Sequence, residues 1–142
     1  RSSSAASDVY KRQILTRGDI MANKERVFNE EEINEKLNGL LVHWYYERGW
    51  IRRKYKTSGW KSTLMVVNTI GHLAEVAWHH PDLSISYAFV IVKLQNHAAK
   101  GITEKDFLLA QEIERVIQWK PGEEGILDGT PEDPRFKYIK YD

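Results

Sequence analysis

The sequence predicts a single α+β domain, with an antiparallel sheet and helices packed on one face of it. Three stretches carry apolar residues at helical spacing, and two others are rich in aromatic and β-branched residues. The helical stretches are 29–42, 59–78 and 103–118, and the strand-like stretches are 44–57 and 84–95. The order of helix, hairpin, helix, strand and helix favours an α+β architecture.

The overall composition agrees with this class and narrows the function. The chain has 142 residues, 42% of them hydrophobic, which suits one compact core. It shows neither an apolar run long enough to span a bilayer nor a secretory signal, so we expect a cytoplasmic protein with no membrane partner. Cysteine is absent, which excludes disulfides and thiolate metal sites. The net charge of +1 gives no strong field for nucleic acid, and we expect none as a partner.

The first residues differ in character from the rest. The segment from Ser3 to Gln13 matches one reading frame of a common transposase sequencing adapter, so we expect residues 1–13 to be an artefact or a disordered tail. Without them the net charge is near −1, so the slightly basic balance says nothing about partners. We expect residues 14–28 to form a flexible N-terminal segment.

The remaining elements follow from local patterns. Asn29 with Glu32 resembles a capping box at the start of the first helix. Arg48-Gly49 suits the turn of a hairpin. In its second strand, alternation predicts one face of Ile51, Arg53, Tyr55 and Thr57, opposite a basic face that begins with Trp50. In the second helix the predicted apolar stripe is Trp60, Leu64, Val67, Ile70, Ala74 and Ala77.

The second half of the chain is less regular. Pro81 ends the second helix. The segment 84–95 is either one long strand or two strands separated by a bend. The domain is expected to cover 29–119, followed by a Pro/Gly-rich extension at 120–142 that reads as loop. The extension contains apolar residues that we expect to pack back on the domain or on a neighbour, namely Phe136, Tyr138, Ile139 and Tyr141.

Histidines and carboxylates gather at the predicted ends of elements. Glu75 and His79 are four residues apart and would share a helix face, with His80 directly after them. His97 follows the long strand, and Asp106 lies in the first turn of the third helix. Side chains at such ends can point into one cleft without crossing the core.

Three interpretations of this group compete. Helix-end histidines are commonly exposed and idle, although three of them interspersed with carboxylates weaken that reading. A metal site is chemically acceptable. It is disfavoured because adjacent histidines point in different directions and no HExxH spacing occurs. The third interpretation is metal-free acid–base catalysis, since imidazoles titrate near neutrality.

The spacing of these residues resembles the signature of the pterin-4a-carbinolamine dehydratases. That signature is matched without a gap by Glu75, His79-His80-Pro81, Tyr87, His97 and Asp106. The segment "GITEKD" at 101–106 also resembles the family's sequence. The resemblance implies the order α-β-β-α-β-β-α with a four-stranded sheet. It implies dehydration of a 4a-hydroxytetrahydropterin to quinonoid dihydropterin, which recycles a pterin cofactor.

The resemblance also implies roles for individual residues. His79 and His97 would transfer protons, with His79 as the leading acid, while His80 would mainly bind and orient the pterin. Glu75 would orient an imidazole or take part in a proton relay, and Asp106 would support His97. The substrate would be lined by these histidines together with Pro81, Asn96, Ala98 and Ala99. No metal or cofactor is implied. The resemblance does imply a homodimer or homotetramer.

The rival interpretation is a non-enzymatic one. The same family includes a transcriptional coactivator and relatives that assist assembly of another enzyme, so the fold alone does not prove catalysis. A scaffold, however, has no need of three imidazoles at these spacings. An enzyme acting on a different pterin stays open as a third possibility.

Overall fold

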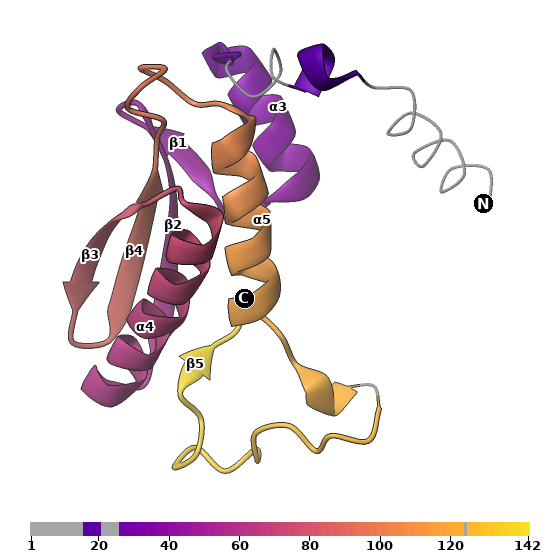
Figure 1. The fold of residues 1–142 in the computed structure, drawn as a ribbon. Coiled ribbons are helices and arrows are strands. Elements are labelled where there is room, and N and C mark those ends of the chain that lie inside the picture. Colours follow the sequence, from indigo (N-terminus) through magenta and orange to yellow (C-terminus); the bar gives the residue numbers. More distant parts are fainter. Residues whose placement is uncertain (1–15, 21–25, 124) are drawn as a thin grey trace.

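The computed structural model describes residues 16–20, 26–123 and 125–142, and Figure 1 shows how their elements are arranged. The predicted artefact at 1–13 lies outside these residues, as do residues 14–15 and 21–25 of the predicted flexible segment 14–28. In chain order the elements are α3 (Glu30–Leu40), β1 (Tyr45–Glu47), β2 (Trp50–Thr57), α4 (Trp60–Ala77), β3 (Asp82–Ser86), β4 (Phe89–Leu94), α5 (Glu104–Ile117), a 3₁₀ turn (Pro121–Glu123) and β5 (Ile139–Lys140). None of the helices in this described part of the chain is long and apolar enough to cross a membrane.

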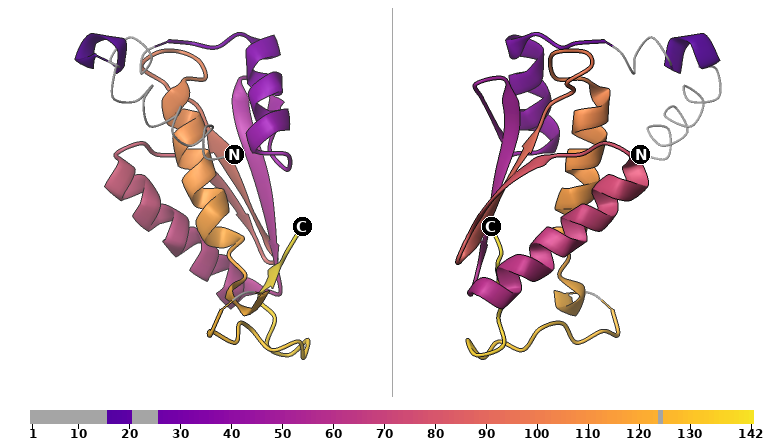
Figure 2. Two further views of the ribbon diagram at one scale, coloured as in Figure 1. Left: turned by 90° about the vertical axis from the view of Figure 1, so that its right-hand side faces the viewer. Right: turned by 60° about the vertical axis from the view of Figure 1, so that its left-hand side comes forward.

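Strands β1 to β4 form one antiparallel sheet in the spatial order β1-β2-β4-β3. The helices pack against one face of this sheet (Figures 1 and 2). The predicted α+β class is therefore confirmed. The segment 84–95, for which the sequence allowed one strand or two, forms β3 and β4 with a turn at 87–88 between them.

The first hairpin follows the sequence closely. Arg48 and Gly49 have φ values of 51° and 85°, as a type I′ turn requires at both central positions. Burial alternates along strand β2 as predicted, and all of its helix-facing residues are buried. These residues are Ile51, Arg53, Tyr55 and Thr57. The hairpin thus sets which face of the sheet meets the helices.

Helix α4 buries a stripe that matches the predicted one only in part, since Ile70 and Ala74 are buried as expected. Three predicted core positions are exposed, namely Trp60, Leu64 and Ala77. The buried residues are Ser62, Thr63, Val66, Ile70 and Ala74. Thr63 occupies a core position because its hydroxyl is satisfied there: it lies 2.7 Å from Thr57 Oγ1 and donates to the Tyr87 carbonyl at 2.9 Å. A satisfied polar group therefore displaces the bulkier residues that hydropathy alone favours.

A polar network lies between β2 and α5. Arg53, only 3% exposed, donates from Nε and Nη2 to the two carboxylate oxygens of Glu114 at 2.9 and 3.0 Å. Tyr55 and Trp44 also donate to Glu114, at 2.7 and 3.0 Å. Burial alone would raise the pKa of Glu114, but these hydrogen bonds outweigh it and hold that pKa below its ordinary value. Burial and the nearby carboxylate raise the pKa of Tyr55.

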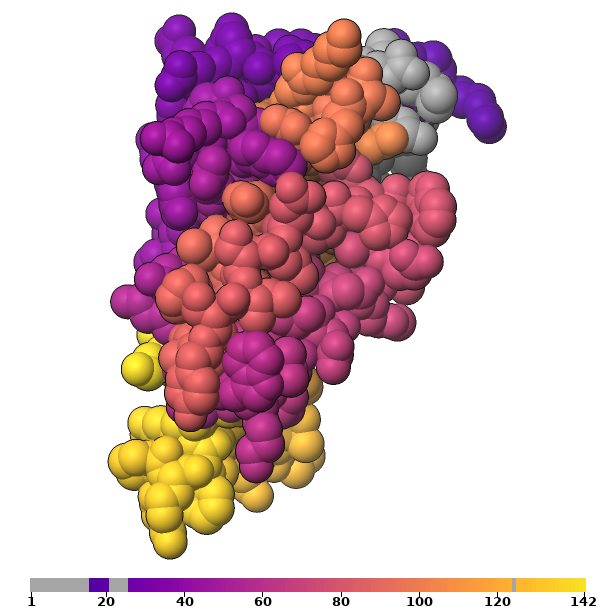
Figure 3. Space-filling view, turned by 90° about the vertical axis from the view of Figure 1, so that its left-hand side faces the viewer, coloured from indigo at the N-terminus to yellow at the C-terminus, as the bar shows by residue number. Residues whose placement is uncertain are grey.

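The C-terminal extension returns to this network instead of remaining loop throughout. Its strand β5 pairs with the end of β2 beyond β1, so the sheet has one strand more than the four implied. Ile139 is buried, and Asp142 forms an ion pair with Arg53. Between the two ends the extension encloses a cavity of about 610 Å³. The extension lies at the end of the domain opposite α3 (Figure 3).

Candidate active site

Helix α4 ends in a turn that separates the two adjacent histidines. Trp78 has left-handed backbone angles, φ 51° and ψ 46°. The His79 N–H donates to the Ala74 carbonyl at 3.1 Å, and the Trp78 N–H to Glu75 at 3.2 Å. This is the Schellman arrangement, in which glycine usually occupies the left-handed position. The reversal of the chain at Trp78 sends His79 and His80 to different partners.

His79 points inward to a buried carboxylate. Its Nε2 atom lies 2.6 Å from Asp106 Oδ1, and the Asp106 side chain is fully buried. The other Asp106 oxygen accepts the Thr103 N–H at 2.8 Å. Because an ionised carboxylate can only accept hydrogen bonds, this contact places a proton on His79 Nε2. The Nδ1 atom is then the ring nitrogen free to exchange a proton with a substrate.

His80 forms the second imidazole–carboxylate pair. Its Nε2 atom lies 2.8 Å from Glu75 Oε1, and both side chains are more than half exposed, at 51% and 69%. The sequence predicted that Glu75 would share a face with His79. The structure differs because the left-handed turn at Trp78 rotates His79 away from the helix face. The Trp78 indole also meets the His80 ring edge to face, with centroids 5.0 Å apart.

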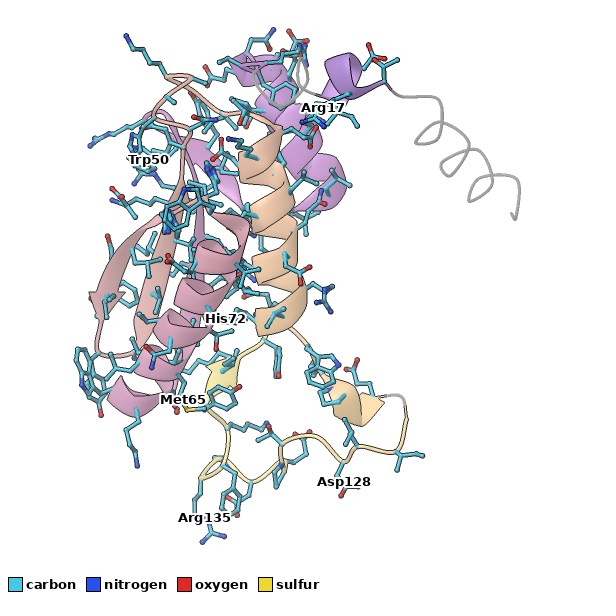
Figure 4. The ribbon with its side chains drawn as sticks, in the orientation of Figure 1. Arg17, Trp50, Met65, His72, Asp128 and Arg135 are labelled. Carbon is cyan, nitrogen blue, oxygen red and sulfur yellow. The ribbon has the colours of Figure 1, made fainter. Side chains whose placement is uncertain are left out.

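His97 lies on a short loop after β4. Asn96 and Gly101 exchange backbone hydrogen bonds of 2.9 and 3.2 Å, which close the loop. The Trp50 indole packs edge to face on His97 at 5.5 Å. Figure 4 labels Trp50 at the end of the sheet where β4 leads toward α5. The histidine itself is exposed.

The buried Asn96 connects the two histidine regions. Its Nδ2 atom donates to Thr103 Oγ1 at 3.2 Å, and its Oδ1 atom accepts the Ala99 N–H at 3.1 Å. Thr103 in turn donates to Asp106, which binds His79. Both polar groups of the Asn96 side chain are therefore used in building the loop. Asp106, predicted to support His97, contacts His79 instead, because the start of α5 lies under the end of α4.

The other predicted residues fall in two places. Pro81 and Ala99 are partly buried and Ala98 is exposed, all close in sequence to the histidines. Tyr87, part of the matched signature, lies at the β3–β4 turn beside Gly59, at the opposite end of the sheet. The structure thus gathers His79, His80 and their carboxylates at one end but leaves Tyr87 outside.

A hollow of about 520 Å³ lies beside His79, between α4 and α5. Most of the residues that line it are apolar, and one lysine and one glutamate also take part. The lining residues are Leu73, Val76, Ala77, Trp78, His79, Lys105, Leu108, Leu109 and Glu112. The larger cavity beneath the C-terminal extension contains none of the predicted site residues. In the described part of the chain, no three potential ligands gather closely enough to suggest a metal centre.

Comparison with known proteins places this arrangement in a family. Residues 26–116 match the family model described as "Pterin 4 alpha carbinolamine dehydratase". This range contains every residue of the histidine group. The chain belongs to this family. The assignment covers strands β1 to β4, helices α3 and α4 and all but the last residue of α5, and stops before the C-terminal extension.

Individual relatives agree with the assignment to the dehydratase family. A protein from Aquifex aeolicus is 43% identical over 93 residues, which is 66% of this chain and 93% of the relative. One from Roseiflexus castenholzii is 37% identical over 91 residues, 64% of this chain and 97% of the relative. Both carry the name "Putative pterin-4-alpha-carbinolamine dehydratase". A crystal structure from Brucella melitensis, titled a transcriptional coactivator/pterin dehydratase, is 28% identical, with a TM-score of 0.59 over 64% of this chain and 98% of that one.

Two residues near the histidines escaped the sequence interpretation. Trp50 and Trp78 each pack edge to face on one histidine of the group, His97 and His80 respectively. A signal for Trp78 is present in the sequence, since an indole directly precedes the two histidines. Trp50 gives no such signal, because its contact depends on the register between β2 and β4.

Proposed function

We propose that the protein dehydrates a 4a-hydroxytetrahydropterin to quinonoid dihydropterin and water, by acid–base catalysis from histidine. The observation that carries the proposal is the contact between His79 and the buried Asp106. It holds the imidazole in one orientation and one tautomer, with Nδ1 available for proton transfer. An idle surface histidine has no need of a fully buried carboxylate partner.

The reaction breaks the C4a–O bond and the N5–H bond and forms a double bond between C4a and N5. Hydroxide is a poor leaving group, so an acid must protonate it, and a base must accept the N5 proton. Each role contributes about 10²–10⁴-fold to the rate. We assign His79 as the leading acid and His97 as its counterpart, with His80 binding and orienting the pterin. The elimination changes no oxidation state, so its balance requires no electron acceptor.

The Asp106 contact supports the acid role directly. A protonated imidazole beside an ionised carboxylate is stabilised by a charge-assisted hydrogen bond. Glu75 can do the same for His80 at the surface, where solvent weakens the interaction. His79, the more strongly held histidine, is therefore assigned to proton transfer, and the exposed His80 is assigned to binding.

Self-association is a second proposal. Phe89 and Ile91 of β4 are half-buried on the face of the sheet away from the helices, and exposed apolar patches commonly mark interfaces. A homodimer or homotetramer would cover them. The Brucella structure is titled a coactivator as well as a dehydratase. An interaction role of this chain is accordingly the alternative to catalysis, and turnover of the hydroxypterin distinguishes the two.

The direct test is the His79→Ala variant. Hydroxypterin consumption is followed by absorbance, and the variant is expected to lose at least about 10²-fold in rate while it stays folded. His72→Ala is the matched control, because His72 is an exposed histidine on the same helix (Figure 4). Undiminished turnover by His79→Ala would remove the assignment of the acid.

A further inference from the structure

Trp78 occupies a backbone conformation that its side chain disfavours. Its φ of 51° is in the left-handed region, where a bulky residue is an outlier and glycine or asparagine is usual. Strain of this kind persists where the surrounding structure or the function requires that residue. The question is what the indole contributes in return for the unfavourable backbone.

Packing in the core does not explain the choice. The Trp78 side chain is 74% exposed, and its ring contact is with His80, edge to face at 5.0 Å. An asparagine or glycine at this position would satisfy the Schellman turn better and would expose less apolar surface. The indole therefore gives the isolated domain little stability.

Its position, in contrast, is well placed for binding. In the sequence Trp78 lies between Glu75 and the two histidines, and in the structure it lines the same hollow as His79. Its edge-to-face contact with His80 leaves most of the indole exposed. A rigid, exposed aromatic ring beside two imidazoles is suited to stacking on a flat conjugated heterocycle.

We propose that Trp78 is a substrate-binding residue, whose indole stacks on the bicyclic ring of the pterin and positions it against His79 and His80. The proposal rests on the proposed function, because it names the ring system on which the histidines act. It commits to the pterin as the occupant of this surface. A second copy of the chain, the competing occupant, would cover the exposed His80–Glu75 pair together with the indole.

The test separates binding from folding. The probe is a 7,8-dihydropterin, which lacks the 4a-hydroxyl group and so does not react. Its dissociation constant is measured by calorimetry for the wild type, Trp78→Asn, Trp78→Phe and Trp60→Phe. Trp60 is the matched control, since it is also exposed but lies at the other end of α4. Melting temperature and sedimentation are recorded for every variant.

The proposal expects binding and stability to move separately. Trp78→Asn should bind the dihydropterin about 5- to 100-fold more weakly, as expected for loss of one stacking platform. Its melting temperature should stay equal or rise by up to about 8 °C, because asparagine tolerates the left-handed conformation. Trp78→Phe should lose less affinity, and Trp60→Phe none. Intrinsic fluorescence of the wild type should be quenched by the ligand, and more weakly so in Trp78→Phe.

Each contrary outcome is distinguishable. If the wild type and Trp78→Asn bind dihydropterin equally, the proposal fails while the proposed function stands. If Trp78→Asn retains affinity but changes the sedimentation coefficient, Trp78 belongs to a subunit interface and the proposal is overturned. If the wild type neither binds dihydropterin nor consumes the hydroxypterin, the proposed function fails and the role of Trp78 fails with it.

Discussion

Replacing Asp106 with asparagine isolates the contact on which the proposed chemistry depends. The Asp106 side chain is fully buried and uses one oxygen for His79 and the other for the Thr103 N–H. Asparagine keeps one acceptor, which the Thr103 N–H requires, and turns an NH₂ group toward His79. Nε2 of His79 must then accept, so the ring can no longer become the doubly protonated imidazolium that gives up its Nδ1 proton as an acid.

The magnitude follows from what is lost. A hydrogen bond to a charged group contributes about 1.5–3 kcal/mol, and the amide restores part of it, so the free energy of unfolding should fall by about 1–2 kcal/mol. The rate should fall much further, because loss of the imidazolium removes the general acid, worth about 10²–10⁴-fold. The variant should therefore remain folded while kcat drops at least about 10²-fold and KM changes little.

Stopped-flow absorbance with the hydroxypterin measures kcat and KM, and circular dichroism measures unfolding. Glu104→Gln serves as the control, since it makes the same chemical change in the first turn of the same helix at a partly exposed ion pair with Lys36. The control should alter neither rate nor stability by more than the small effect of a surface ion pair. A folded Asp106→Asn protein with the kcat of Glu104→Gln would refute the argument that Asp106 sustains the acid form of His79.

Three further outcomes follow from the buried contacts. Glu114→Gln should lower the free energy of unfolding by about 2–4 kcal/mol, since Arg53 loses one of its two charged partners and keeps only Asp142; urea melts that coincide with the wild type would contradict this. The pKa of Glu114 in the folded protein lies below its ordinary 4.5. The ionised carboxylate therefore stabilises the fold above pH 4.5, and this stabilisation is lost as the pH falls through the folded pKa. Between pH 6 and 3, the urea midpoint should fall more steeply for the wild type than for Glu114→Gln. Asn96→Ala should reduce turnover by loosening the loop that carries His97, and crystallographic retention of that loop with full activity would count against the assignment.

Those elements that depend on local sequence could be predicted. Alternation in β2 identifies its buried face without any tertiary information, because side chains on a strand point to opposite sides in turn. Arg48-Gly49 and the Asn29 capping box work in the same way, through hydrogen bonds and dihedral angles a few residues apart. The spacing also grouped the histidines and carboxylates that the structure pairs, and their role as a site stays a prediction.

The pairing within that group could not be predicted, because it depends on a single dihedral angle. Had Trp78 continued the helix, Glu75 would face His79, as the four-residue spacing suggests. The positive φ of Trp78 instead lets His80 contact Glu75 and directs His79 to Asp106. Tryptophan does not indicate a left-handed turn, so the sequence did not predict the turn at this position.

The stripe on α4 and the strand β5 escaped prediction for a tertiary reason. Thr63 becomes a core residue only because Thr57 and the Tyr87 carbonyl are present to bond its hydroxyl. The two residues of β5 form a strand because β1 is short and leaves the end of β2 unpaired. Neither partner is visible in the local sequence, where 120–142 reads as proline- and glycine-rich loop.

The central claim is that these histidines catalyse dehydration of a hydroxypterin. The most direct measurement compares loss of the 4a-hydroxypterin in buffer with its loss in the presence of the purified wild-type protein and of His79→Ala/His97→Ala. The wild type should accelerate water loss by several orders of magnitude, and the double variant should fall close to the uncatalysed rate while it stays folded. A wild-type protein that leaves the buffer rate unchanged would contradict the claim.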